Sequence, residues 1–258
     1  MFVDSHCHLD RLDKSPQELA EVIHIAQQRG VEHFLCVCVS VNDFPAMMQS
    51  IKPFNNVSAS CGVHPLHQDE ACSYDELLAM ASSDNIVAIG ETGLDYFYSA
   101  ETKDVQLTSF VDHIKVANEL NKPLIIHTRD ARQDTIALLK QHKAPTTRGV
   151  LHCFTEDWEM AEAAIALGFY ISISGIVTFK SAQALQDVVK KIPLENLLIE
   201  TDSPWLAPVP YRGKQNQPGY VREIGEFIAE LKGVSAEELA RITTENFYQL
   251  FNISKTST

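Results

Sequence analysis

Residues 2–30 read FVDSHCHLDRLDKSPQELAEVIHIAQQRG and contain one complete strand–helix unit. The apolar start, Val3 to His6, is typical of a buried β-strand. Ser15-Pro16-Gln17-Glu18 has the spacing of a capping box with proline at the first helical position, and Gly30 suits a helix C-cap. The stretch therefore predicts a strand followed by a helix.

The same order of strand and helix recurs along the rest of the chain. Further strands are expected at residues 33–39, 57–63, 86–90, 123–127, 149–152, 169–174 and 197–201. Helices are expected at 43–51, after a second capping box at 73–76, and at 101–120, 130–142, 157–167, 182–191, 221–231, 236–241 and 245–250. Eight such units favour an α/β fold, a TIM (β/α)8 barrel, over an open doubly wound sheet.

The length of 258 residues suits one barrel domain covering residues 1–258. No apolar run approaches the roughly 20 residues that span a bilayer, and the N-terminus lacks a signal-peptide pattern, so we expect a cytoplasmic protein with no membrane association. The net charge of -13 argues against broad electrostatic binding to a nucleic-acid duplex. It does not exclude a strand end as substrate, because bound divalent cations neutralise negative charge locally.

The first predicted strand carries two histidines separated by one residue. Side chains at i and i+2 of a strand point to the same face, so His6 and His8 could bind one metal ion. Alone the pair is a weak signal, because such histidines are often held only by hydrogen bonds.

Further metal-binding residue types lie at other strand ends, where barrel enzymes place their active sites. Burying several unpaired ionisable groups at one rim would be costly unless they share a function. The candidate metal ligands are His6, His8, Glu91, His127, His152 and Asp202.

Four imidazoles and two carboxylates suit divalent ions such as zinc, manganese, iron, cobalt or nickel, with magnesium also possible. Six ligands are too many for one tetrahedral zinc, so two ions bridged by the carboxylate of Glu91 are predicted. Asp202 is the candidate general base, because a carboxylate beside a metal-bound water can take its proton. Glu91 and Asp202 are therefore the candidate catalytic residues.

Short motifs follow the predicted strands in order: VDSHCHLD at 3–10, CGVHP at 61–65, GETGLDY at 90–96, KP at 122–123, HTR at 127–129, HCF at 152–154 and ETDSP at 200–204. Together these motifs resemble those of the TatD family of metal-dependent deoxyribonucleases. The histidine-x-histidine pair and the segment 206–216, LAPVPYRGKQN, make the chain most similar to the bacterial YcfH-like branch. Trp205 stands where tyrosine is common, so an aromatic ring is retained.

The resemblance implies an amidohydrolase-type barrel with two divalent metal cations, for which magnesium, zinc, manganese, nickel or cobalt are candidates. One ion would be held by His6, His8, Glu91 and Asp202, and the other by Glu91, His127 and His152. The implied activity is hydrolysis of phosphodiester bonds in DNA, typically as a 3'-5' exonuclease on single strands. No obligate protein partner is evident.

Substrate contacts are less well defined by the sequence. His64 could contact a phosphate or bond to loop backbone, and Arg129 could clamp phosphate or pair with Asp130 or Asp134. Arg212, in a Pro/Gly-rich loop, is a third candidate phosphate contact. Tyr96, Phe97 and Tyr98 could stack an unpaired base, although packing against the neighbouring loop is favoured. Asp4 and Asp95 are expected to orient ligands or cap loops, and structural or surface roles are expected for His24, His33, His67, His113 and His142.

Two other functions stay open. The same metal pair can activate water against a carbonyl carbon, as in an amide, a lactone or an aminoacyl-RNA ester. Glutamate rather than lysine at the end of the fourth strand favours the nuclease branch, because some carbonyl-acting relatives carry a carbamylated lysine there. A non-catalytic metal-binding adaptor is least favoured, because all six expected ligands are present.

Overall fold

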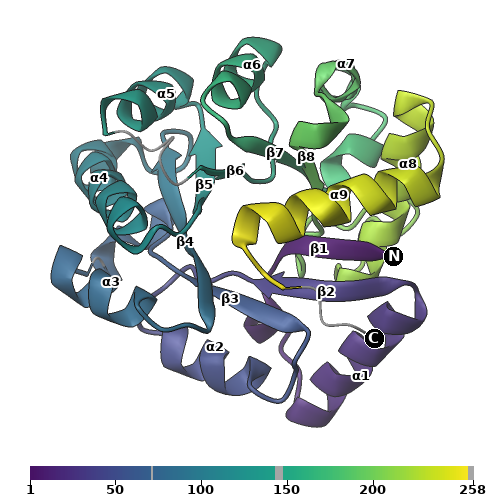
Figure 1. The fold of residues 1–258 in the computed structure, drawn as a ribbon, viewed down its shortest axis with the longest axis horizontal. Coiled ribbons are helices and arrows are strands. Elements are labelled where there is room, and N and C mark those ends of the chain that lie inside the picture. The colour runs from purple at the N-terminus through teal and green to yellow at the C-terminus, as the bar shows by residue number, and fades with distance from the viewer. Residues whose placement is uncertain (71, 143–147, 255–258) are drawn as a thin grey trace.

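The computed structural model describes residues 1–70, 72–142 and 148–254. Its centre is one parallel sheet in which each strand pairs with the next along the chain, in the order β1 to β8 (Figure 1). The strands are β1 Phe2–Cys7, β2 Val31–Cys36, β3 Val57–Cys61, β4 Ile86–Asp95, β5 Leu124–Arg129, β6 Gly149–Leu151, β7 Tyr170–Ile173 and β8 Leu197–Ile199.

Helices surround the sheet as an outer ring (Figure 1). Both predicted capping boxes are present, because the hydroxyls of Ser15 and Ser73 accept from the backbone three residues on, and Glu18 and Glu76 reach back. The helices are α1 Pro16–Gln28, α2 Phe44–Ile51, α3 Tyr74–Ala81, α4 Lys103–Leu120, α5 Arg132–Gln141, α6 Trp158–Ala166, α7 Gln183–Lys191, α8 Val221–Lys232 and α9 Ala236–Phe251.

The seam between β8 and β1 nearly closes the sheet into the predicted barrel. The backbone N–H of Asp202 donates to the carbonyl of His6 at 2.9 Å, and that of His8 donates to the carbonyl of Ser203 at 2.8 Å. The buried carboxylate of Asp4 accepts from Thr201 twice, at 2.8 Å from its backbone and 2.6 Å from its hydroxyl. Asp4 thus connects the first strand to the residue that follows Glu200 after the last strand.

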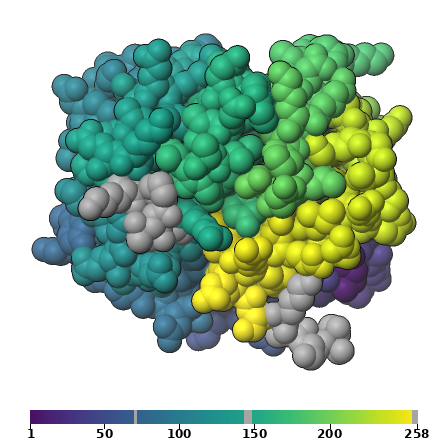
Figure 2. Space-filling view, turned by 45° about the horizontal axis from the view of Figure 1, so that its top comes forward, coloured from purple at the N-terminus to yellow at the C-terminus, as the bar shows by residue number. Residues whose placement is uncertain are grey.

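Helix α9 covers the end of the barrel where the strands begin. Its Phe247, Leu250 and Phe251 pack in one cluster with inward-facing residues such as Val3 of β1 and Leu198 of β8. Figure 1 shows α9 crossing in front of the strands, and Figure 2 shows the yellow C-terminal segment reaching across this face of the molecule. The carboxyl ends of the strands are therefore left for a functional site.

Most element boundaries shift by a few residues from the sequence predictions, and two differences affect the barrel end and the site. The two helices expected at 236–241 and 245–250 form the single helix α9, because Thr243 and Thr244 are buried and the tertiary contacts outweigh their weak helix propensity. The Thr243 hydroxyl also bonds to the carbonyl of Leu239 at 3.0 Å, within the helix. Strand β4 continues past the expected end at residue 90 to Asp95, so Glu91 lies within the strand.

No helix in the described part of the chain is long and apolar enough to cross a membrane.

Candidate metal centre

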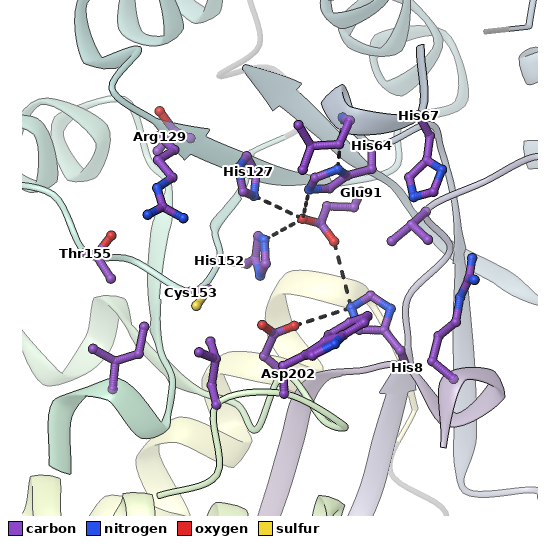
Figure 3. Close-up of a pocket in the computed structure, with 17 residues that line it drawn as sticks. His8, His64, His67, Glu91, His127, Arg129, His152, Cys153, Thr155 and Asp202 are labelled. Atoms are coloured by element: carbon purple, nitrogen blue, oxygen red, sulfur yellow. Dashed lines mark hydrogen bonds and ion pairs between the residues drawn. The ribbon is translucent and has the colours of Figure 1, made fainter. Parts of the chain in front are cut away.

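The structure brings all six predicted metal ligands together at the carboxyl ends of the strands. Figure 3 shows His8, Glu91, His127, His152 and Asp202 pointing toward one another from different elements. His6, His8 and Glu91 form one group able to hold a metal ion, and His6, His152 and Asp202 form a second. A third group combines His64, Glu91 and His127.

The carboxylate of Glu91 lies between two sets of histidines. Its Oε2 is 3.3 Å from Nε2 of His6 and 4.0 Å from Nε2 of His8. Its Oε1 is 2.7 Å from Nε2 of His152 and 3.3 Å from Nδ1 of His127. The two oxygens therefore face different ligand groups, which is the arrangement expected of a carboxylate that bridges two ions.

A glycine in β4 lets Glu91 and His127 come close. Gly93 has φ +134°, and a Cβ at this position would lie 2.0 Å from the carbonyl oxygen of His127. Only glycine tolerates both this conformation and this approach of the neighbouring backbone. The GETGLD motif thus allows β4 and β5 to pack with their ligands side by side.

Asp202 reaches the first ligand group from the loop after β8. Its Oδ1 lies 3.3 Å from Nε2 of His8 and 3.8 Å from Nε2 of His6. The residue has a left-handed φ of 56°, which aspartate adopts more readily than most residues. This turn, together with its backbone bond to His6, directs the carboxylate toward the two histidines.

Each histidine with a fixed partner presents its other ring nitrogen to the centre. A carbonyl can only accept, so Nδ1 of His8 carries the hydrogen that it donates to Val37 at 2.8 Å. Nε2 of His127 lies 3.0 Å from Oδ2 of Asp95, and Nδ1 of His152 lies 3.2 Å from Oε1 of Glu200. Carboxylate partners of this kind orient metal-binding histidines and increase their basicity.

The resulting arrangement fits a bound cation. Nε2 of His152 is buried and has no hydrogen-bond partner among the described residues, although it faces Oε1 of Glu91. With Nδ1–H directed to Glu200, a neutral His152 turns a lone pair toward a negatively charged oxygen. A positive charge between them removes this repulsion, so the donor set fits divalent metals.

The carboxylates are held in their charged form. Burial alone would raise the pKa of Glu91, but His152 and His64 hold it well below its ordinary value. Burial would likewise raise the pKa of Asp202, yet the hydrogen bond from His8 and the charge of His6 lower it. Both side chains are therefore available as anionic ligands.

Two of the three predicted substrate contacts, His64 and Arg129, lie at the site. A cavity of about 590 Å³ lies over the ligands, and both His64 and Arg129 line it. Nε2 of His64 is 3.2 Å from Oε1 of Glu91, so this histidine reaches the centre itself. Arg212 does not line this cavity. Its guanidinium packs instead over the ring of Phe179, 4.0 Å from the ring centre.

Three residues beside the site were given no role from the sequence. Glu200, which fixes His152, lies two residues before Asp202, and its place in the ETDSP motif was the available signal. Arg11 and Trp205 both line the cavity, and the indole packs edge-on against His8 at 5.1 Å between ring centres. Arg11 follows His8 by three residues, a spacing that carries no recognisable pattern.

The fold is a (β/α)8 barrel, and the ends of its strands carry histidines and carboxylates in groups able to hold metal ions. The phosphotriesterase homology protein of Escherichia coli shares this fold, with a TM-score of 0.72 at 17% identity over 97% of this chain and 98% of that one. The family model described as TatD related DNase matches residues 3–252. The chain belongs to the TatD family.

Two relatives are similar along nearly the whole chain. The uncharacterized metal-dependent hydrolase YcfH of Escherichia coli K12 is 51% identical over 254 residues, covering 98% of this chain and 96% of that protein. The crystal structure of YjjV, a TatD homologue from Escherichia coli K12, has a TM-score of 0.91 and 30% identity and covers 98% of each chain.

Proposed function

We propose that this protein hydrolyses phosphodiester bonds in DNA, acting as a 3'-5' exonuclease on single strands with two divalent metal ions. The observation that carries the proposal is the position of Glu91, whose two oxygens face His6 and His8 on one side and His127 and His152 on the other. The description of the matching family as TatD related DNase supports DNA as the substrate.

The ligands divide between two ion positions. His6, His8, Glu91 and Asp202 would hold one ion, and Glu91, His127 and His152 the other. When bound, a pair of divalent ions lowers the pKa of water and stabilises negative charge on phosphate oxygens. Glu91 would fix the separation between the two positions, because one rigid carboxylate contributes to both.

Asp202 would act as the general base. Its carboxylate is charged, because nearby histidines lower its pKa despite burial, and it lines the cavity where a substrate would enter. It can therefore accept a proton from an attacking water and hold it beside His8. Its backbone bond to His6 ties the position of the base to that of the first ligand group.

Two guanidinium groups could bind the phosphates of the strand. Arg11 follows β1 and Arg129 ends β5, and these strands lie on opposite sides of an eight-stranded barrel. Both side chains line the cavity, although Arg11 is also paired with Asp43 at 2.6 Å. A few local contacts of this kind suit a strand end and a chain of net charge -13.

The proposal is tested with single-stranded oligonucleotides labelled at the 3' or the 5' end, assayed with a series of divalent metals. We expect stepwise shortening from the 3' end that chelation abolishes, and a loss of about 100-fold or more in Asp202→Asn. The exposed surface variant Asp187→Asn should behave like the wild type.

A parallel panel of acyl esters and amides at equal metal loading separates phosphorus from carbon as the target. Faster turnover of a carbonyl substrate than of any phosphodiester would contradict the proposal. Activity that survives both chelation and Asp202→Asn would do so as well.

A further inference from the structure

Two aromatic side chains beside the cavity are exposed to solvent. Phe97 and Tyr98 follow β4, and their relative exposures are 56% and 61%. Their rings meet edge to face, with centres 4.7 Å apart and an interplanar angle of 89°. Large apolar side chains exposed as a pair beside a functional site are more informative than single exposed residues, which are common on protein surfaces.

The neighbouring aromatic residue behaves differently. The hydroxyl of Tyr96 donates to Asp134 at 2.7 Å, and the ammonium group of Lys103 lies 4.5 Å from its ring centre. The packing expected for the aromatic cluster therefore applies to Tyr96, whereas the rings of Phe97 and Tyr98 are left open.

Arg129 connects the exposed rings to the cavity. Its guanidinium carbon lies 4.1 Å from the ring centre of Phe97 and 4.6 Å from that of Tyr98. The same side chain lines the cavity over the metal ligands (Figure 3). No carboxylate among the described residues is within ion-pair distance of Arg129, so its charge is held by the two rings and is free to meet an anion.

Asp95 fixes the aromatic pair relative to the metal centre. Its Oδ1 accepts from the backbone N–H of Phe97 at 3.0 Å and from that of Tyr98 at 2.8 Å. Its Oδ2 bonds to Nε2 of His127, which is a predicted metal ligand. One buried carboxylate thus sets both the orientation of a ligand and the position of the exposed rings.

We propose that Phe97, Tyr98 and Arg129 form a stacking platform, a surface on which one unpaired nucleobase of the substrate strand packs while Arg129 binds the adjacent phosphate. This inference rests on the proposed function for its substrate class. A flat ring matches the exposed aromatic surface, and the cation in contact with it matches the phosphate of the same nucleotide. Duplex DNA hides its base faces, so the platform selects a single strand.

Stacking can contribute to DNA binding even though the protein is negatively charged. A chain of net charge -13 gains little from long-range attraction to DNA, whereas base–aromatic stacking contributes about 1–3 kcal/mol for each base and does not depend on net charge. Every base has a flat face, so the platform predicts binding with little sequence preference.

The experiment compares oligonucleotides that carry a normal base with matched ones that carry a tetrahydrofuran abasic residue at each of the terminal nucleotides in turn. With the metal-loaded wild type, kcat/KM should be about tenfold higher for the base-containing strand at one position. Phe97→Ala/Tyr98→Ala should reduce this ratio to about one, mainly through KM. Phe97→Tyr/Tyr98→Phe should restore it, and Ile25→Ala, an exposed apolar position on α1, should leave it unchanged.

The test uses the ratio of kcat/KM for base-containing and abasic strands. A general loss of activity in a variant lowers both values and leaves their ratio interpretable. No discrimination by the wild type at any terminal position would overturn the platform, and so would a ratio that survives removal of both rings. If no oligonucleotide is cleaved, the proposed function fails. The same strands are then compared by fluorescence anisotropy, and equal binding of base-containing and abasic strands overturns the platform too.

Discussion

Nε2 of His152 lies 2.7 Å from Oε1 of Glu91, in a buried contact where His152 has already directed its other nitrogen toward Glu200. Burial alone would lower the pKa of His152, yet the charges of Glu91 and Glu200 raise it well above its ordinary value. The contact therefore favours a positive charge, which a proton on His152 supplies in the metal-free protein and a divalent metal would supply when bound.

Removing the N-terminal histidine pair should empty one ion position. His6→Ala/His8→Ala leaves Glu91, His127 and His152 in place, so the metal content should fall from about two ions per chain toward one. The content is measured by elemental analysis after dialysis against the chosen metal. His24→Ala, on α1 and outside the cavity lining, is the matched control. An unchanged content in the double variant would place these histidines outside the metal centre.

Asp95 should influence metal affinity without touching a metal. Asp95→Asn removes the charge that orients His127, and changes of this kind cost about 10- to 100-fold in metal affinity. Calorimetric titration of the metal-free protein measures the loss, with the exposed Asp104→Asn on α4 as control. An affinity equal to that of the wild type would show that Asp95 serves only the backbone of the following loop.

A buried histidine outside the site should make stability depend on pH. Burial lowers the pKa of His113 to about 4, and its Nε2 accepts from the backbone N–H of Val63 at 3.0 Å. The unfolded chain takes up this proton near pH 6.5, so the stabilisation is complete above that value and is lost as the pH falls toward about 4.

A glutamine in place of His113 does not titrate. His113→Gln should therefore reduce the loss of unfolding free energy between about pH 7 and pH 5 by about 2 kcal/mol. Denaturant unfolding at both pH values, with chelator present, measures the difference regardless of the absolute stability of the variant. A loss equal to that of the wild type would mean that His113 is not kept neutral by burial.

Much of the site could be predicted because the repeating strand–helix pattern determines which residues share a rim. The i, i+2 spacing of His6 and His8 and the position of Asp202 just after the eighth strand required only the order of elements. Glu91 was expected at the end of the fourth strand, but this strand continues to Asp95. The partners of the ligands could not be predicted in this way. Glu200 is distant from His152 in the chain, and Arg212 lies over Phe179 for reasons of loop packing. Such contacts depend on tertiary structure.

The helix prediction at the C-terminus was wrong for a related reason. Ile242, Thr243 and Thr244 have weak helical propensity, and the sequence alone indicates a break there. The packing of Phe247 and Leu250 against the open end of the barrel stabilises one continuous helix. Local patterns could not show this, because the barrel end that the helix covers is made by all eight strands.

Anomalous diffraction from crystals loaded with manganese would show whether Glu91 bridges two ions. Two anomalous peaks about 3.5–4 Å apart are expected. One should be bound to Oε2 of Glu91 beside His6 and His8, and the other to Oε1 beside His127 and His152. A single peak under saturating metal, or two peaks of which Glu91 contacts only one, would show that Glu91 does not bridge two ions.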